Sequence, residues 1–182
     1  MRHLAFAAAA AMIVAGCKSA SVSTSPPPGK AAMAVVVSSS AFPQSSPIPA
    51  AVTCDGAGQS PDLSWTSVPD ETKSIAIVVD DPDAPNGTFT HWIAWNIAPE
   101  TRTLGAGGNG GLAGGESGTN DFDREGYSGP CPPKGQLHHY RFRVYGLDTK
   151  LSLRPSDKRA DLDKAMAGHV LAEGQLVGTF QH

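Results

Sequence analysis

The sequence has little charge and few cysteines, and both shortages exclude classes of protein. Charged residues make up 17% of the chain, and the net charge is −3. Lysine and arginine form no cluster, whereas a general nucleic-acid binder gathers them to neutralise phosphates, so we expect no nucleic-acid partner. The 3 cysteines and 6 histidines show none of the spacings of a zinc site, so we expect no bound metal.

No nucleotide cofactor is expected either, although a GxGxxG string begins at Gly105. That fingerprint works only where its third glycine opens a helix whose N-terminus can bind a pyrophosphate, and no helical pattern follows here. The 20 glycines and 15 prolines among 182 residues instead predict a loop-rich chain. Its length is sufficient for a single domain with a proper core.

The N-terminus predicts export. A positively charged residue precedes an apolar run over 4–14, which is shorter than the roughly 20 residues that span a bilayer as a helix. The run ends in Val14–Cys17, and this VAGC sequence resembles the lipobox of bacterial lipoproteins. We therefore expect a lipoprotein signal peptide over 1–16. The alternative is an ordinary signal peptide that is cleaved near Ala15 or Ala20.

Lipidation of Cys17 would anchor the protein to a membrane of the bacterial cell envelope, in a periplasmic or surface-facing position. We expect residues 17–32 to form a Ser/Pro-rich tether and residues 33–182 to form the domain. The two cysteines of that domain, Cys54 and Cys131, either form a disulfide, as pairs outside the cytoplasm often do, or remain separate buried thiols.

The domain is expected to be mainly β. Strands are predicted over Met33–Val37, Ser74–Val79, Thr90–Ile97, His138–Leu147 and Gln175–Phe180. The second of these is apolar on both faces and should therefore be buried, and the fourth alternates between two different faces. Strand and helix do not alternate regularly along the chain, which favours a β-sandwich with a peripheral helix over a doubly wound sheet.

One helix is expected near the C-terminus. Ser156 is its predicted N-cap, and Gly174 is its predicted end. The apolar side of this helix is formed by residues at helical spacing, namely Leu162, Ala165, Met166, His169 and Val170.

Two segments carry the residue types that binding or catalysis requires. The first is Asp80–Pro85, with His91 soon after it, and the second is Gly126–Gly135, which leads into His138–Tyr140. Prolines at this density fix the backbone, so the second segment should form a rigid wall rather than a mobile lid. Aspartates in such a run often only cap the backbone of a turn. Together, the two segments predict a pocket of mixed polarity.

The same segments resemble the signatures of the phosphatidylethanolamine-binding protein family. They are DPDAP over 81–85 with a histidine at 91, and GPxPPxG over 129–135 followed by HxY over 138–140. Further motifs resemble the bacterial branch of that family, the Raf-kinase-inhibitor-like proteins. These are CDG, SPDLSW and TNDF, at residues 54–56, 60–65 and 119–122.

The resemblance implies a Greek-key antiparallel β-sandwich with a C-terminal helix, long loops and a small cleft for phosphate-like anions. The chain departs from the family's pattern at Asp123, where glycine is usual, and over 178–182, where many members have a tyrosine and a terminal arginine. By position, the ligand-binding residues fall on Asp81, Pro85, His91, Gly129, Pro132, Pro133, His138 and Tyr140.

The chemistry of these side chains suits an anion. His91 and His138 can donate N–H groups and carry charge at low pH, and Tyr140 can donate its hydroxyl from the same strand face as His138. Asp81 would accept an N–H from a histidine and fix its tautomer, or would accept from the amine of a phosphoethanolamine-like ligand.

Three functions remain as hypotheses. The first is a membrane-anchored binding protein for a small anion or a phospholipid headgroup. The second is a protein-interaction or inhibitor domain with a protease or envelope protein as partner. The third is a hydrolase that uses an Asp–His pair as general base. The chain has no G-x-S-x-G nucleophile motif, and we therefore expect that it is not an enzyme.

Overall fold

The computed structural model describes residues 32–66, 68–107 and 112–182. The predicted signal peptide, Cys17 and the tether up to residue 31 lie outside the described residues. Within the described part, no helix is long and apolar enough to cross a membrane.

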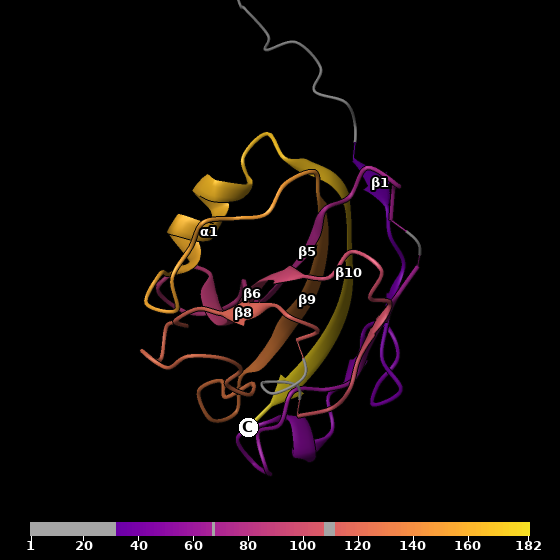
Figure 1. The fold of residues 1–182 in the computed structure, drawn as a ribbon. Coiled ribbons are helices and arrows are strands. Elements are labelled where there is room, and N and C mark those ends of the chain that lie inside the picture. Colours follow the sequence, from indigo (N-terminus) through magenta and orange to yellow (C-terminus); the bar gives the residue numbers. More distant parts are fainter. Residues whose placement is uncertain (1–31, 67, 108–111) are drawn as a thin grey trace, which may run out of the picture.

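A mixed seven-stranded sheet forms the centre of the molecule, with strand order β1-β10-β9-β5-β6-β8 and with β3 paired to β10 (Figure 1). Its long strands are β5 (Ser74–Asp81), β6 (Phe89–Ile97), β9 (Leu137–Leu147) and β10 (Val170–Gln181). Its short strands are β1 (Met33–Ala34), β3 (Ser46–Pro47) and β8 (Glu116–Ser117).

A second, three-stranded sheet packs against one face of the first. It consists of β2 (Val37–Ser38), β4 (Leu63–Trp65) and β7 (Thr103–Leu104), in the order β2-β4-β7. Residues Ala50–Val52 form a short 3-10 helix. The larger apolar core lies between the sheets, because it contains residues of both, such as Leu63 from the small sheet and Val79 from the large one.

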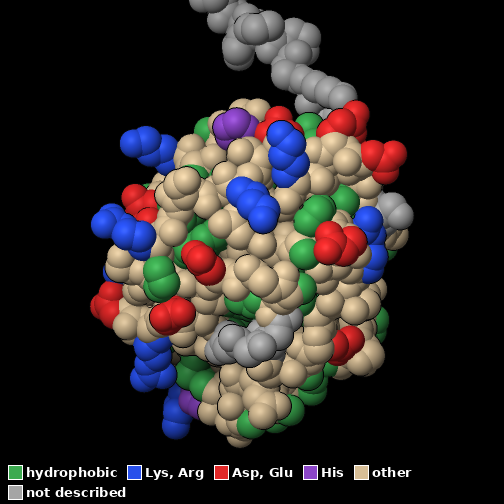
Figure 2. All heavy atoms as spheres, in the orientation of Figure 1, with side chains coloured by type: hydrophobic (Ala, Val, Ile, Leu, Met, Phe, Trp, Pro, Cys, Tyr) green, Lys and Arg blue, Asp and Glu red, His purple; other side chains and the backbone are tan. Residues whose placement is uncertain are grey.

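The other face of the large sheet is covered in part by helix α1 (Arg159–Met166) (Figure 1). A second apolar cluster joins them, in which Leu162 and Met166 of the helix pack with Val78 and Trp95 of the sheet. Strand β5 is therefore buried along its whole length, as its apolar sequence predicts. Figure 2 shows acidic and basic side chains interspersed over the visible surface, without a basic patch.

The prediction of a mainly β domain with one C-terminal helix and long loops is confirmed. The sheets are not strictly antiparallel, because β1 and β3 both pair with β10 in parallel. The predicted strand over Met33–Val37 is also divided, since β1 joins the large sheet and Val37 pairs with Trp65 in the small one. The Greek-key order of the strands stays a prediction.

The predicted limits of the helix are wrong. It begins after Lys158, whose backbone N–H donates to the Asp161 carboxylate at 3.1 Å, and it ends at Met166. Val170 and Gly174 belong to β10. The glycine serves strand packing, because a Cβ at residue 174 would lie 1.8 Å from the carbonyl oxygen of Val35. A side chain there would therefore displace the segment that pairs along this edge of β10.

Candidate functional site

The site is formed where three neighbouring strands place polar side chains at the same end of the large sheet. Asp81 is the last residue of β5, His91 lies near the start of β6, and His138 and Tyr140 lie near the start of β9. Because β5 runs antiparallel to both neighbours, the end of β5 lies beside both starts. All four side chains are buried.

Asp81 and His138 form a buried pair. The Nδ1 of His138 lies 2.7 Å from Oδ2 of Asp81, and the two side chains are only 4% and 5% exposed. A carboxylate oxygen accepts, so Nδ1 carries the hydrogen. The other ring nitrogen, Nε2, lies 3.3 Å from Oε1 of Gln136. The role assigned to Asp81 in orienting a histidine therefore matches this geometry at His138 rather than at His91.

His91 has a different environment. Its Nδ1 donates to the backbone carbonyl of Ser128 at 2.8 Å, which leaves Nε2 as the second ring nitrogen. Burial lowers the pKa of His91 below 6.5, although the bond to Ser128 and the nearby charge of Asp81 partly oppose this shift. The ring is therefore neutral at pH 7, with Nε2 available as an acceptor.

Tyr140 lies beside His91, and their rings meet edge to face with centroids 5.3 Å apart. Its hydroxyl is buried and makes no hydrogen bond of acceptable distance and angle within the described residues. Burial raises the pKa of Tyr140, and the charge of Asp81 raises it further. The phenol therefore remains protonated at neutral pH.

A cavity of about 140 Å³ opens onto these groups. Six of the predicted ligand-binding residues line it, namely Asp81, Pro85, His91, Pro132, Pro133 and His138. Tyr140 lies behind the lining, against His91. Gly129 lines a neighbouring cavity instead.

The structure also places residues in the lining that the sequence analysis did not select, namely Ala84, Phe89, Phe122 and Cys131. Ala84 and Cys131 lie inside the two signature segments, so the segments themselves indicated them. Phe89 precedes His91 by two positions, and strand periodicity places both on one face. Phe122 ends the TNDF motif, which suggested the family but did not indicate that this ring contacts those of Phe89 and His91.

Asn120 determines the position of Phe122. It is fully buried, and its side-chain oxygen accepts from the backbone N–H groups of Phe122 at 2.9 Å and Arg124 at 3.2 Å. Its amide nitrogen donates to the Ser128 hydroxyl and to the Gly126 carbonyl, both at 2.9 Å. One buried side chain therefore joins the turn that carries Phe122 to the segment that contacts His91.

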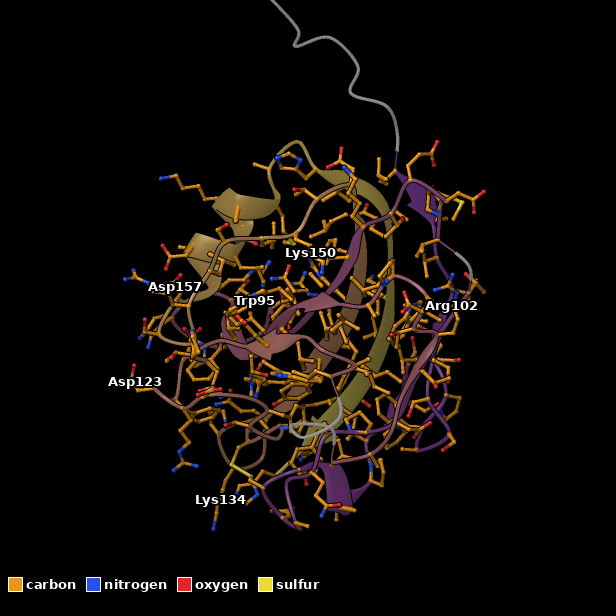
Figure 3. All side chains as sticks on the ribbon, viewed as in Figure 1. Trp95, Arg102, Asp123, Lys134, Lys150 and Asp157 are labelled. Atoms are coloured by element: carbon orange, nitrogen blue, oxygen red, sulfur yellow. A yellow bond between two sulfur atoms is a disulfide. The ribbon has the colours of Figure 1, made fainter. Side chains whose placement is uncertain are left out.

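The proline-rich wall of the cavity is fixed to the rest of the domain. Cys131 forms a disulfide with Cys54, drawn close to Lys134 in Figure 3. The backbone N–H of Cys54 also donates to the Pro130 carbonyl at 3.0 Å. The hydroxyl of Tyr127 donates to the Val52 carbonyl at 2.9 Å. These bonds support the interpretation of this segment as a rigid wall.

The C-terminus contacts this wall without lining the cavity. His182 accepts from the Gly135 N–H at 2.9 Å through its backbone oxygen, and its ring lies 2.6 Å from Asp55. Within the described residues, Cys54, Asp55 and His182 are close enough together to resemble a set of metal ligands. Because the sulfur of Cys54 is bonded to Cys131, it does not fit a metal-ligating thiolate.

Comparison with known proteins identifies the family. The sequence profile of the family described as phosphatidylethanolamine-binding protein matches residues 38–181. The chain belongs to the phosphatidylethanolamine-binding protein family. This confirms the resemblance carried by the DPDAP and GPxPPxG segments.

Relatives within the phosphatidylethanolamine-binding protein family support this result. A UPF0098 protein of Pyrococcus horikoshii is 49% identical over 152 residues, which cover 79% of this chain and 75% of that protein. LppC of Mycobacterium tuberculosis, whose name proposes a lipoprotein, is 41% identical over 155 residues, covering 85% of this chain and 76% of that one.

Solved structures of the family share the fold. The structure of CT736 from Chlamydia trachomatis, titled as a homologue of this family, has a TM-score of 0.76 and 37% identity, covering 82% of this chain and 98% of that chain. The structure of YbcL from E. coli, titled as a new member of the mammalian family, has a TM-score of 0.77 and 30% identity, covering 81% of this chain and 98% of that chain.

Proposed function

We propose that this member of the phosphatidylethanolamine-binding protein family binds a small phosphate-like anion in the 140 Å³ cavity. The observation that carries the proposal is the pair of buried histidines in the lining. Each has its Nδ1 engaged by a protein oxygen, Asp81 for His138 and the Ser128 carbonyl for His91. Each ring is therefore fixed in orientation, and the opposite nitrogen of His91 is available to a ligand.

The size and polarity of the cavity favour a small group. A volume of 140 Å³ is roughly that of four or five water molecules in the liquid, which is enough for a phosphate but not for a large organic molecule. Proline and phenylalanine side chains form much of its lining. Such walls exclude water and strengthen the hydrogen bonds that the histidine rings can offer to an anion.

The neutral state of His91 makes anion binding dependent on pH. Before binding, burial keeps the pKa of His91 below 6.5. A fully ionised anion such as sulfate has no hydrogen to donate to the neutral Nε2 of His91. His91 can therefore form a hydrogen bond to the anion only if Nε2 takes up a proton when the anion binds. Affinity should therefore increase as the pH falls toward the lowered pKa, and it should level off below it.

The first prediction concerns this proton uptake. Between about pH 8 and about pH 6, the affinity for sulfate should increase by up to about tenfold for each unit of pH. Calorimetry on the purified protein in two buffers of different ionisation enthalpy would measure both the affinity and the number of protons taken up. Sulfate binding that is independent of pH would contradict the role of His91 as a charged donor.

The second prediction isolates His91 by substitution. His91→Gln should weaken binding of inorganic phosphate by at least about tenfold, because a charge-assisted hydrogen bond is lost. The matched control is His139→Gln, since His139 lies on β9, next to His138 in the sequence, but is exposed and paired with Asp83. Equal weakening by both substitutions would show that general charge, and not the cavity, attracts the anion.

We also propose that lipidation of Cys17 anchors this domain to an envelope membrane. The VAGC sequence and the name of the mycobacterial relative support this proposal. In cells fed radiolabelled palmitate, the native chain should be labelled and the Cys17→Ser variant should not. Cys54→Ser is the control that should remain labelled, because its cysteine lies in the domain. A native chain that takes up no label would refute the anchor.

A binding function also agrees with the name of the family, which refers to binding rather than to a reaction. No second function is supported by an independent observation in the described residues.

A further inference from the structure

A second cavity adjoins the first. Its volume is about 380 Å³, and Phe122 and Cys131 belong to the linings of both cavities. The segment Tyr127–Gly129 lines the second cavity, while the Ser128 carbonyl binds Nδ1 of His91 in the first. The two cavities therefore share Phe122 and the disulfide-bonded Cys131 as common walls.

The second cavity differs from the first in chemistry. Much of its lining is apolar or lacks a side chain, namely Phe122, the disulfide-bonded Cys54 and Cys131, Ala57, Gly58 and Gly129. Its charged members, Arg124 and Glu125, are adjacent and opposite in sign, so they give it no net charge. This surface suits an uncharged organic group better than a second anion.

Phe122 has the properties expected of a contact residue. It is 40% exposed, which is unusual for so large an apolar side chain in this domain. Its position is also fixed in two ways. Asn120 accepts a hydrogen bond from the backbone N–H of Phe122, and the ring of Phe89 meets the ring of Phe122 edge to face with centroids 4.7 Å apart. An exposed but preorganised ring can stack on a flat ligand with little loss of conformational entropy.

We infer that the second cavity is a subsite for the organic group of a phosphate monoester whose phosphate occupies the first cavity. This inference rests on the proposed anion site and names the class of its ligand. The first cavity is too small to hold a substituent larger than the phosphate itself. Such a substituent would extend past Phe122 into the second cavity. The ligand class is therefore a phosphate monoester with a flat, apolar substituent.

The test compares inorganic phosphate, methyl phosphate and phenyl phosphate by calorimetry on the purified full chain. Phenyl phosphate should bind at least about tenfold more tightly than methyl phosphate, as expected for burial of one aromatic ring. Ala57→Trp should fill the subsite and remove that preference while leaving the affinity for inorganic phosphate unchanged. Ala167→Trp, at the exposed end of α1, is the control that should retain the preference.

The outcomes separate the two proposals. If inorganic phosphate binds but methyl and phenyl phosphate bind equally, the subsite is wrong and the anion site remains. The subsite is also overturned if Ala57→Trp keeps the preference for phenyl phosphate. If inorganic phosphate does not bind the native chain, the anion site is wrong, and the subsite that depends on it falls with it. Binding of phosphate by Ala57→Trp also shows that the variant is folded.

Discussion

Asp80→Ala should lower the free energy of unfolding by about 2–4 kcal/mol, because it removes two charge-assisted hydrogen bonds and leaves partly buried arginine charges without their shared partner. The Asp80 side chain is fully buried, and it accepts from Nε of Arg141 at 2.6 Å and from Nη1 of Arg159 at 3.0 Å. Nε of Arg143 lies at 4.0 Å. Removing the carboxylate therefore affects several cations at once.

The position of Asp80 explains why the effect should be large. Asp80 lies on β5, Arg141 on β9 and Arg159 in the first turn of α1, so this ion pair network joins the helix to the sheet. Asp81 is the next residue along β5 and points to the opposite side of the sheet, toward the cavity. Two adjacent aspartates thus have separate roles, one in stability and one in the proposed site.

Urea unfolding followed by circular dichroism would measure the effect. Asp163→Ala is the matched control, because Asp163 also binds Arg159, at 2.7 Å, but is half exposed. It should cost less than about 1 kcal/mol. A loss for Asp80→Ala as small as that of the control would show that the arginines find water or other partners when Asp80 is absent.

The sequence predicted which segments form strands and a helix better than it predicted where those elements begin and end. The run over residues 74–79 predicted a strand buried on both faces because apolar residues there are continuous, and β5 has that environment. The end of the helix was misplaced because His169 and Val170 continue the helical spacing by chance, although His169 is exposed and paired with Asp148. Gly174 is needed for a contact between residues far apart in the sequence, because Val35 approaches β10 at this position. No local sequence pattern indicates such a contact.

The same limit applies to the candidate site. Residues inside the two signature segments could be selected because proline, histidine and aspartate in those patterns are rare elsewhere in the chain. Asn120 and Phe122 belong to the TNDF motif, but the motif gave them no role in the site, because that role depends on how a turn folds back onto His91. Local spacing also could not assign Asp81 to His138 rather than to His91, since that choice depends on the register of three strands.

The disulfide provides the second large effect on stability. Replacing both cysteines, Cys54→Ser with Cys131→Ser, should lower the free energy of unfolding by about 4 kcal/mol, because the bond closes a loop that restricts the unfolded chain. The two cysteines are 77 positions apart in the sequence, and stabilisation of this kind increases with loop length. In a domain of this size, the expected loss corresponds to a fall in melting temperature of roughly 8–16 °C.

Thiol counting and calorimetry together test this prediction. In the Cys17→Ser background, unreduced and denatured protein should have no reactive thiol, and two reactive thiols would show that the bond does not form. Native protein treated with reductant should melt like the double-serine variant, because both lack the same constraint. If the serine variant alone is destabilised, the loss comes from the substitutions themselves.

The disulfide should affect ligand binding as well as stability. Cys131 lines the cavity that contains His91 and also the adjacent subsite, so the bond fixes the wall that both share. The histidines themselves are fixed independently of it, by Asp81 and by the Ser128 carbonyl. Below its melting temperature, the serine variant should therefore keep its affinity for inorganic phosphate to within a few fold and lose more of its affinity for phenyl phosphate. An equal loss for both ligands would mean that the disulfide positions the anion site directly.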